Sequence, residues 1–158
     1  MPQENAPSFA IHQINLTDIF TLHAKLPEMR AAESIEHYIN RIKSRPYLAL
    51  AAYVDNQPIG FKLGYAESEQ TFYSWLGGVI PDYRRMGVAK ALIDAQEKWA
   101  KYAGYKTLSV KSMNRYPSML RLLIGAGYVI DGYEANGDQM EAKILFSKSL
   151  LDPKGEHS

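Results

Sequence analysis

The segment "GGVIPDYRRMGVAKALIDAQ", residues 77–96, joins the end of an apolar run to the start of a helical pattern. Gly77 and Gly78 add no side-chain bulk, and Pro81 cannot donate to a strand ladder, so a strand is expected to end here. After Arg85, apolar residues recur at helical spacing. The segment therefore predicts a strand, a short loop and a long amphipathic helix whose first turn has little side-chain cover.

The start of this helix has the properties of an anion site. The first N–H groups of a helix lack carbonyl partners and carry a partial positive charge that favours phosphate. Gly87 and Ala89 leave the backbone accessible, while Arg84 and Arg85 add charge and forked donors. The predicted phosphate cradle consists of Arg84, Arg85, Met86, Gly87, Val88, Ala89 and Lys90. The alternative interpretation is an ordinary strand–loop–helix connection with a solvated arginine pair.

The strand before the cradle narrows the choice of ligand. Glycines inside a strand indicate a bulge or the close approach of another backbone, and a strand that opens here exposes N–H and C=O groups. An amide-bearing chain lying in the gap would pair with these groups as an added strand does. A diphosphate cradle beside a slot for an extended amide is what coenzyme A requires. We therefore expect Val79 and Ile80, at the end of the strand, to contact the pantetheine arm.

Composition and charge limit the classes of function. The chain has 158 residues, which suits one domain spanning 1–158 with an ordered core over about 8–150. The formal net charge of +1 gives no global field that favours nucleic acid or anionic lipid. A sequence without cysteine has no disulfide, thiolate metal site or cysteine nucleophile. No apolar run approaches the ~20 residues of a membrane span and the N-terminus is unlike a signal peptide, so a cytoplasmic location is expected.

Periodicity and turn signals predict one mixed α/β domain with the order β-α-α-β-β-β-α-β-α-β-β and a central mixed sheet flanked by helices. Strands are expected at 8–14, 47–54, 59–67, 72–79, 106–113, 128–134 and 140–149. Helices are expected from Thr17 or Asp18 to Lys25, over 33–44, after Arg85 as far as Gly104, and from Pro117 to Gly125 or Gly127. The last two strands are expected to be joined through Asn136-Gly137, which is the strongest hairpin signal in the chain.

The long helix is predicted to bury one stripe and to expose another. Its apolar stripe consists of Val88, Leu92, Ala95, Trp99 and Tyr102. Asp94 and Glu97 each precede a lysine by four residues, Lys98 and Lys101 respectively. This spacing predicts two ion pairs on the solvent side of the helix.

The pattern Val79-x-Pro81-x-x-Arg84-x-x-Gly87-x-Ala89-x-x-Leu92 closely resembles the acyl-CoA signature of the GNAT superfamily of N-acyltransferases. Two later segments are also similar to that family. Asn114, at the end of the following strand, resembles its pantetheine-binding asparagine, and Pro117–Tyr128 resembles its next helix and aromatic strand start. The resemblance spans about residues 8–149 and implies the GNAT fold, with acetyl-CoA as co-substrate.

The resemblance implies transfer of an acetyl group from the CoA thioester to a primary amine. Since no cysteine is present to form an acyl-enzyme, direct attack within a ternary complex is the simpler route. The main-chain N–H of Val79 or Ile80 would donate to the tetrahedral oxyanion. The alternative function is an acyl-CoA-binding sensor or partner-binding module of the same fold without turnover.

Two side chains are candidates for proton transfer. Many family members have a carboxylate on the strand before the cradle, but residues 71–79 contain no acid, which leaves Glu67 as the candidate base. The family's tyrosine acid would fall at Leu123 or Arg121, so Tyr116 near the helix start is the candidate substitute. The competing interpretations are a solvated strand-end glutamate, a tyrosine used for packing and a chain of waters that carries the proton.

The acceptor is expected to be a small-molecule or peptide amine. Glu28, Glu33 and Glu36 put negative charge around the early helices, which suits a cationic amine and equally suits a solvated face. Asn114 has its own alternative as the N-cap of the following helix. The histidines lack metal-ligand spacing, so no metal is expected. No nucleic-acid or membrane partner is expected, and exposed strand edges would permit a homodimer.

Overall fold

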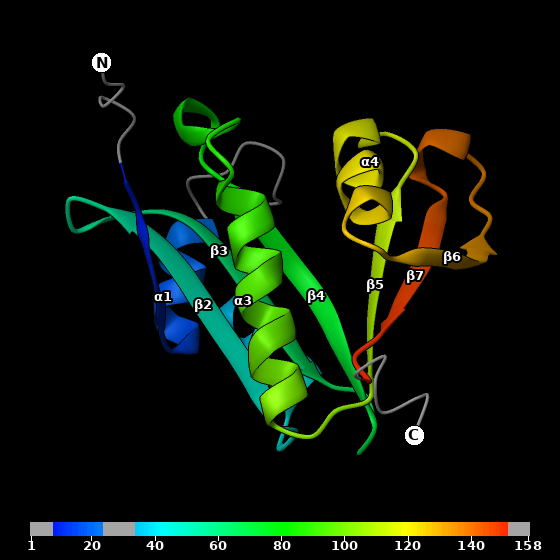
Figure 1. The fold of residues 1–158 in the computed structure, drawn as a ribbon, viewed down its shortest axis with the longest axis horizontal. Coiled ribbons are helices and arrows are strands. Elements are labelled where there is room, and N and C mark those ends of the chain that lie inside the picture. The colour runs from blue at the N-terminus through cyan, green and yellow to red at the C-terminus, as the bar shows by residue number, and fades with distance from the viewer. Residues whose placement is uncertain (1–7, 24–33, 152–158) are drawn as a thin grey trace. The chain divides into compact units, whose positions relative to one another are not determined.

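A computed structural model describes residues 8–23 and 34–151 of the chain (Figure 1). Its helices and strands follow the predicted order, from β1 (Ala10–Gln13) to β7 (Lys143–Ser149). Between these strands lie α1 (Leu16–His23), α2 (Ile35–Ile42), β2 (Tyr47–Val54), β3 (Gln57–Ala66), β4 (Thr71–Val79), α3 (Val88–Tyr102), β5 (Thr107–Met113), α4 (Pro117–Gly125) and β6 (Val129–Glu134). Two short 3-10 turns, η1 (Pro81–Tyr83) and η2 (Gln139–Glu141), follow β4 and β6.

The seven strands form one mixed sheet in the order β1-β2-β3-β4-β5-β7-β6 (Figure 1). β1 runs antiparallel to β2, and β7 runs antiparallel to both β5 and β6. β4 and β5 are parallel, with Thr71 opposite Thr107 and Ser74 opposite Val110. A parallel pair requires a crossover connection, and α3 provides it. The predicted mixed α/β architecture, with a sheet flanked by helices, is confirmed.

The chain divides into two compact units. The first unit comprises Met1–Gly64 with Leu76–Gln96, and the second comprises Tyr65–Trp75 with Glu97–Ser158. The division passes through β3, β4 and α3, so each of these elements contributes residues to both units. That the whole chain acts as one domain stays a prediction from its length.

The core of the first unit is built from apolar side chains of β2, β3 and the helices. Its most deeply buried large members are Ile19, Leu22, Tyr38, Ile42, Leu48, Ile59, Phe61, Leu63, Leu92 and Ile93. β2 and β3 are joined by Asp55 and Asn56, which both have positive φ. A two-residue turn of this kind matches the twist of the strands that it connects. Most of the apolar run of β2 is buried in this core.

Helix α1 begins earlier than predicted because Asn15 provides its cap. The Asn15 side-chain oxygen accepts from the Asp18 N–H at 3.0 Å. The prediction that Thr17 or Asp18 is the cap is therefore wrong. The predicted end of this helix at Lys25 lies outside the described residues. Helix α2 is capped by the side chain of Ser34.

The predicted apolar stripe of α3 is wrong at its last position. Tyr102 is 92% exposed, although its spacing places it one turn after Trp99. Tyr105, just beyond the helix, instead lies beside Phe72 and Trp99, with ring centroids 5.2 and 6.2 Å away. Gly104, at φ +101, ends the helix between the two tyrosines, as predicted.

Glu97 of α3 is not on the solvent side. Its carboxylate accepts from the Tyr128 hydroxyl at 2.7 Å and from Lys148 Nζ at 2.9 Å. Lys148 also donates to the Ala126 carbonyl at 2.7 Å, and its amine lies 5.5 Å from the centroid of the Tyr128 ring. These contacts join α3 to β7 and to the start of β6. The predicted local ion pair between Glu97 and Lys101 is therefore wrong, because Glu97 pairs with distant residues.

The last two strands are joined by a longer connection than predicted. β6 ends at Glu134, which lies opposite Lys143 at the start of β7. Within the connection, the side chains of Asn136 and Asp138 each accept from the N–H group two residues later. These bonds satisfy backbone donors in a loop that includes η2. The predicted joining of the two strands through Asn136 and Gly137 is confirmed, although β7 begins at Lys143 and not at Met140.

Candidate active site

The connection from β4 to α3 is shaped by its backbone conformation. After η1, Arg84 is extended, with φ −75 and ψ 159. Arg85 then takes φ +70 and Gly87 takes φ +84, both in the left-handed region. These two reversals lead the chain into α3 at Val88.

Gly87 leaves open space at the entrance to α3. A Cβ atom at this residue would meet no atom of the described part of the chain within 4 Å. The Gly87 carbonyl accepts the first bond of the helix, from the Ala91 N–H at 3.0 Å. The N–H groups of the first turn, over residues 88–90, therefore have no carbonyl partner within the helix. Glycine here supplies the positive φ and leaves these donors accessible to an anion.

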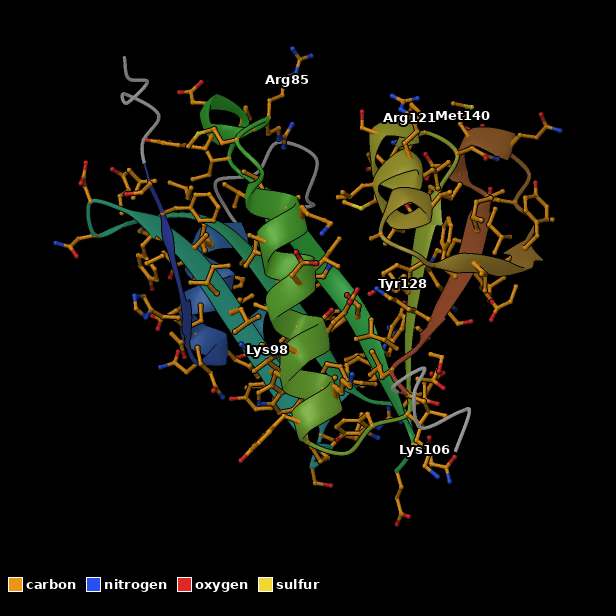
Figure 2. All side chains as sticks on the ribbon, in the orientation of Figure 1. Arg85, Lys98, Lys106, Arg121, Tyr128 and Met140 are labelled. Carbon is orange, nitrogen blue, oxygen red and sulfur yellow. The ribbon has the colours of Figure 1, made fainter. Side chains whose placement is uncertain are left out.

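The cations around this entrance differ in their contacts. Arg84 Nε donates to the Val79 carbonyl at 2.8 Å, which ties the loop to the end of β4. Lys90 Nζ contacts both carboxylate oxygens of Asp94, at 2.9 and 3.0 Å. Asp94 is predicted to pair with the lysine one turn later, whereas the structure pairs it with the lysine one turn earlier. Arg85 is exposed, and its side chain points away from the loop (Figure 2).

The end of β4 separates the two predicted main-chain donors. The Ile80 N–H donates to the Ile59 carbonyl at 2.8 Å, so this donor is used within the first unit. Because successive strand residues direct their N–H and C=O groups to alternate sides, those of Val79 point away from β3. The Val79 carbonyl accordingly accepts from Arg84. Of the two candidates for the oxyanion donor, the Ile80 N–H is already used in a hydrogen bond, and the Val79 N–H stays the candidate.

Two glycines permit close approach between β3 and β4. A Cβ at Gly60 would lie 3.1 Å from the Gly78 carbonyl oxygen. A Cβ at Gly77 would lie 3.2 Å from Lys62 Nζ and 3.3 Å from the Phe61 carbonyl oxygen. The glycines that the sequence indicates as an opening for a ligand are therefore also needed for contacts within the protein.

Lys62 is a residue of this region that sequence reasoning missed. It lies in the middle of β3 and is only 9% exposed. Among the described residues, none forms a hydrogen bond or an ion pair with its amine. Burial lowers the pKa of Lys62 from 10.5 to about 8. The signal in the sequence is a lysine between Gly60 and Gly64 on an otherwise apolar strand.

Asn114 and Tyr116 lie in the second unit, between β5 and α4. Asn114 Nδ2 donates to the Gln139 carbonyl at 2.9 Å, which anchors η2. The N-cap of α4 is Tyr116, which makes no side-chain capping bond. The alternative that Asn114 caps this helix is therefore wrong. Both side chains are half-buried, and their predicted roles toward the ligand stay predictions.

Glu67 lies in the hairpin between β3 and β4. Its N–H donates to the Thr71 carbonyl at 2.8 Å, and its carboxylate accepts from the Ser109 hydroxyl at 3.2 Å. Glu67 therefore lies beside the first residue of β4, whereas Val79 is the last. The side chain is exposed to solvent. Its role as the base stays a prediction.

Residues 8–23 and 34–151 contain no cluster of three or more His, Cys, Asp or Glu side chains that could hold a metal ion. Within the same ranges, each helix is too short or too polar to cross a membrane. Of the acidic residues predicted near the acceptor, Glu28 and Glu33 lie outside the described residues. Glu36 is exposed in the first turn of α2.

A match to a known family covers most of the fold, including the β4–α3 loop. Residues 16–122 match the acetyltransferase (GNAT) family. The chain belongs to this family. Its membership confirms the resemblance seen in the sequence and supports an acyltransferase that uses acetyl-CoA. No curated protein sequence matches the chain.

Solved structures of GNAT proteins share the fold. The ribosomal-protein-S18-alanine N-acetyltransferase from Escherichia coli has a TM-score of 0.78 at 15% identity, covering 92% of this chain and 96% of its own. Ard1 from Thermoplasma volcanium has a TM-score of 0.76 at 18% identity, covering 91% and 99%. A GNAT family acetyltransferase from Elizabethkingia anophelis with acetyl-CoA bound has a TM-score of 0.72 at 17% identity, covering 93% and 99%. At these identities the likeness establishes the GNAT fold.

Proposed function

We propose that this GNAT protein transfers the acetyl group of acetyl-CoA to a primary amine, by direct attack of the amine within a ternary complex. The acceptor is a small-molecule or peptide amine, and the reaction takes place in the cytoplasm. The observation that carries the proposal is the bare backbone at the start of α3, where residue 87 combines φ +84 with open space. We also propose that the protein can form a homodimer.

The residues at the start of α3 fit a diphosphate group. The N–H groups of residues 88–90 supply donors, and the partial positive charge of the helix adds to their attraction for an anion. Arg85 is exposed and extends outward from the loop (Figure 2), and its charge is proposed to attract the diphosphate. Arg84 and Lys90 hold the loop and the first turn in place through Val79 and Asp94, and their positive charge is proposed to add to the attraction for the diphosphate.

Val79 and Asn114 are proposed to hold the pantetheine arm. The main-chain groups of Val79 point away from β3; its carbonyl accepts from Arg84, and its N–H is proposed to pair with an extended amide on that side. The Asn114 amide nitrogen is fixed by the Gln139 carbonyl, which leaves its oxygen to accept from an N–H group of the arm. The Val79 N–H is also proposed to donate to the oxyanion that forms during transfer.

Proton transfer is assigned to two side chains. Glu67 is proposed to take the proton from the acceptor amine; its exposed carboxylate, shared with Ser109, would act through water. Tyr116, at the start of α4, is proposed as an acid. The rate is expected to depend mainly on the positioning of both reactants, with these proton transfers as a further contribution.

Consumption of the thioester tests the proposal. Release of free CoA thiol is measured from acetyl-CoA with small amines, polyamines, aminoglycosides, amino acids and peptides. Peptides are included because one structural neighbour is named as an N-acetyltransferase for the alanine of ribosomal protein S18. Release that depends on an amine supports the enzyme. Tight acetyl-CoA binding without release across the panel would favour a binding module, and failure to bind acetyl-CoA would refute both.

A further inference from the structure

The amine of Lys62 lies close to Gly77, near the end of β4. Its Nζ and Cγ atoms are 3.2 and 3.8 Å from the place where a Gly77 Cβ would be. The side chain therefore runs from β3 along the bare backbone of Gly77. Lys62 is 9% exposed, whereas Gly77 is exposed. The largely buried Lys62 side chain thus reaches an exposed residue of β4.

Among the described residues, no charged group of the neighbouring elements balances this amine. Lys62 has no hydrogen bond or ion pair to any residue that the structure describes. The ionisable side chains of β2 and β4 are only the tyrosines Tyr47, Tyr53 and Tyr73. The buried residues of α3 in the first unit are the uncharged Val88, Leu92, Ile93 and Gln96. A largely buried ammonium without a counter-charge among these residues is unfavourable, and an anionic group of a ligand would supply one.

Gln96 is a second polar group without a partner in the first unit. It is 1% exposed, and its Nε2 and Oε1 atoms make no hydrogen bond within the described part of the chain. A Cβ at Gly60, two residues before Lys62 on the same face of β3, would lie 3.4 Å from Val88 Cγ1. This face of β3 is therefore directed toward α3. Buried polar groups of this kind are commonly satisfied by water, which would also carry protons to the lysine.

We propose that Lys62 donates the proton that the CoA thiolate needs as it departs. The inference rests on the proposed function. With the diphosphate at the start of α3, an extended pantetheine arm lying along β4 would run back from the end of this strand toward Gly77. Gly77 lies two residues before Val79, and the amine of Lys62 lies beside it. This assigns to Lys62 the role of acid that the proposed function gives to Tyr116.

The step balances without any further reactant. The acceptor nitrogen forms a bond to the thioester carbonyl carbon, the C–S bond breaks, and its electron pair stays on sulfur. The Lys62 ammonium gives its proton to this sulfur, which leaves free CoA thiol and a neutral lysine. The proton lost by the acceptor nitrogen returns to the lysine through water. The products are the acetylated amine and CoA.

The Lys62 ammonium and the CoA thiol have similar pKa values. Burial lowers the pKa of Lys62 to about 8. An ordinary thiol has a pKa of about 8.5, and an ordinary lysine about 10.4. Proton donation is most effective when the pKa of the donor lies near the working pH. Lys62 therefore suits a thiolate better than an exposed lysine would.

Kinetics of Lys62→Met test the assignment. Methionine keeps the length of the side chain and removes the amine. With acetyl-CoA and an amine identified in the panel, kcat is expected to fall about 10- to 100-fold, with KM for acetyl-CoA changed less than about threefold. The decline of kcat above about pH 8 in the wild type is expected to disappear, because it reports loss of the lysine proton. Lys98→Met, which alters an exposed lysine of α3 (Figure 2), is expected to change neither property.

Tyr116→Phe is the comparison within the proposed machinery. A Tyr116→Phe enzyme that keeps the decline above about pH 8, while Lys62→Met loses it, supports the assignment to lysine. Unchanged kcat and pH profile in Lys62→Met would overturn it. Loss of the decline in Tyr116→Phe alone would also overturn it.

A second measurement does not depend on turnover. The far-ultraviolet absorbance of the thiolate gives the pKa of the CoA thiol when CoA is bound. The wild type is expected to hold this pKa lower than Lys62→Met by about one unit, a tenfold change, while both proteins bind desulfo-CoA equally. A Lys62-dependent thiol pKa in a protein without turnover would refute the proposed function and leave the position of Lys62 supported. An identical thiol pKa in the two proteins, or an equal loss of affinity for CoA and desulfo-CoA, would overturn the inference.

Discussion

Replacing Gly87 by valine is the most direct test of the cradle. The substitution puts a branched side chain into the open space through which a diphosphate would reach the N–H groups of residues 88–90. Each lost hydrogen bond to a charged group is worth about 1.5–3 kcal/mol, and about 1.4 kcal/mol corresponds to a tenfold change in affinity. We therefore expect the affinity for acetyl-CoA, measured by titration calorimetry, to fall by well over tenfold.

The same substitution strains the backbone without a steric clash inside the protein. Residue 87 has φ +84, and holding a residue with a side chain in this region costs about 2 kcal/mol. For a protein of this size, that cost lowers Tm by about 4–8 °C. The folded state is retained, because proteins are commonly stable by about 5–15 kcal/mol. A thermal scan beside the calorimetry therefore separates loss of the fold from loss of the binding surface.

Gly104→Val is the matched control. Gly104, at the other end of α3, has φ +101, and a Cβ there also meets no described atom within 4 Å. This variant is expected to lower Tm by a similar amount and to leave the affinity for acetyl-CoA within about twofold. Gly87→Asn should lower Tm less than valine does, because asparagine tolerates positive φ. Unchanged affinity in Gly87→Val, or an equal loss in Gly104→Val, would refute the reasoning.

Four further substitutions test single side chains. Lys62→Met is expected to raise the free energy of unfolding by about 3 kcal/mol at pH 7, because folding lowers the Lys62 pKa from 10.5 to about 8. This cost is fully present below pH 8 and is relieved as the pH rises toward 10.5, so the urea-unfolding gap between wild type and variant should narrow there; a constant gap would contradict it. Glu97→Gln is expected to cost about 1–3 kcal/mol in urea unfolding, since Lys148 and Tyr128 lose a largely buried carboxylate. Asp94→Asn breaks an exposed pair and should cost less than about 0.5 kcal/mol, so equal losses would count against the role of burial. Glu67→Gln is expected to lower the amine-transfer rate and to shift its pH profile, whereas an unaltered profile would point to water or another residue as the base.

Elements that depend on nearby residues could be predicted from the sequence. The apolar run 47–54 forms β2 with the predicted limits, and Pro117 begins α4. Gly104 ends α3 at a positive φ that other residues rarely adopt. In each case the deciding interaction, whether a missing N–H, a bare Cα or a continuous apolar run, lies within a few residues of the position itself. Residue order alone is then sufficient.

Contacts between distant residues could not be predicted in this way. The spacing of Glu97 and Lys101 favours a local ion pair, but Glu97 bonds to Lys148, 51 residues later in the chain. Tyr102 has the spacing of a buried residue, yet the rings of Phe72 and Trp99 pack against Tyr105 beyond the end of the helix. A helical repeat shows which residues share a face, but it does not show where the partner elements end.

In the candidate site too, features set by nearby residues could be predicted, whereas contacts between distant residues could not. The position of the cradle at the head of α3 follows from local signals, namely the glycine at 87 and the start of the apolar repeat. The contacts that give the cradle its form could not be read in the same way. Arg84 bonds to the Val79 carbonyl, and Ile80 gives its N–H to Ile59 on another strand. The second bond uses a predicted main-chain donor within the protein, and only the pairing of β3 with β4 reveals it.

Lys62 and Gly77 are best understood together. A lysine in the middle of an apolar strand lowers stability, and a glycine in the neighbouring strand forgoes packing, so each residue is unfavourable for the fold alone. The structure brings them together, because a Cβ at Gly77 would lie 3.2 Å from Lys62 Nζ. Departures of this kind from what favours stability are expected where a protein meets its ligand. On this argument Gly87 lies at the diphosphate end of the slot and Gly77 at its thioester end, with the last residues of β4 between them.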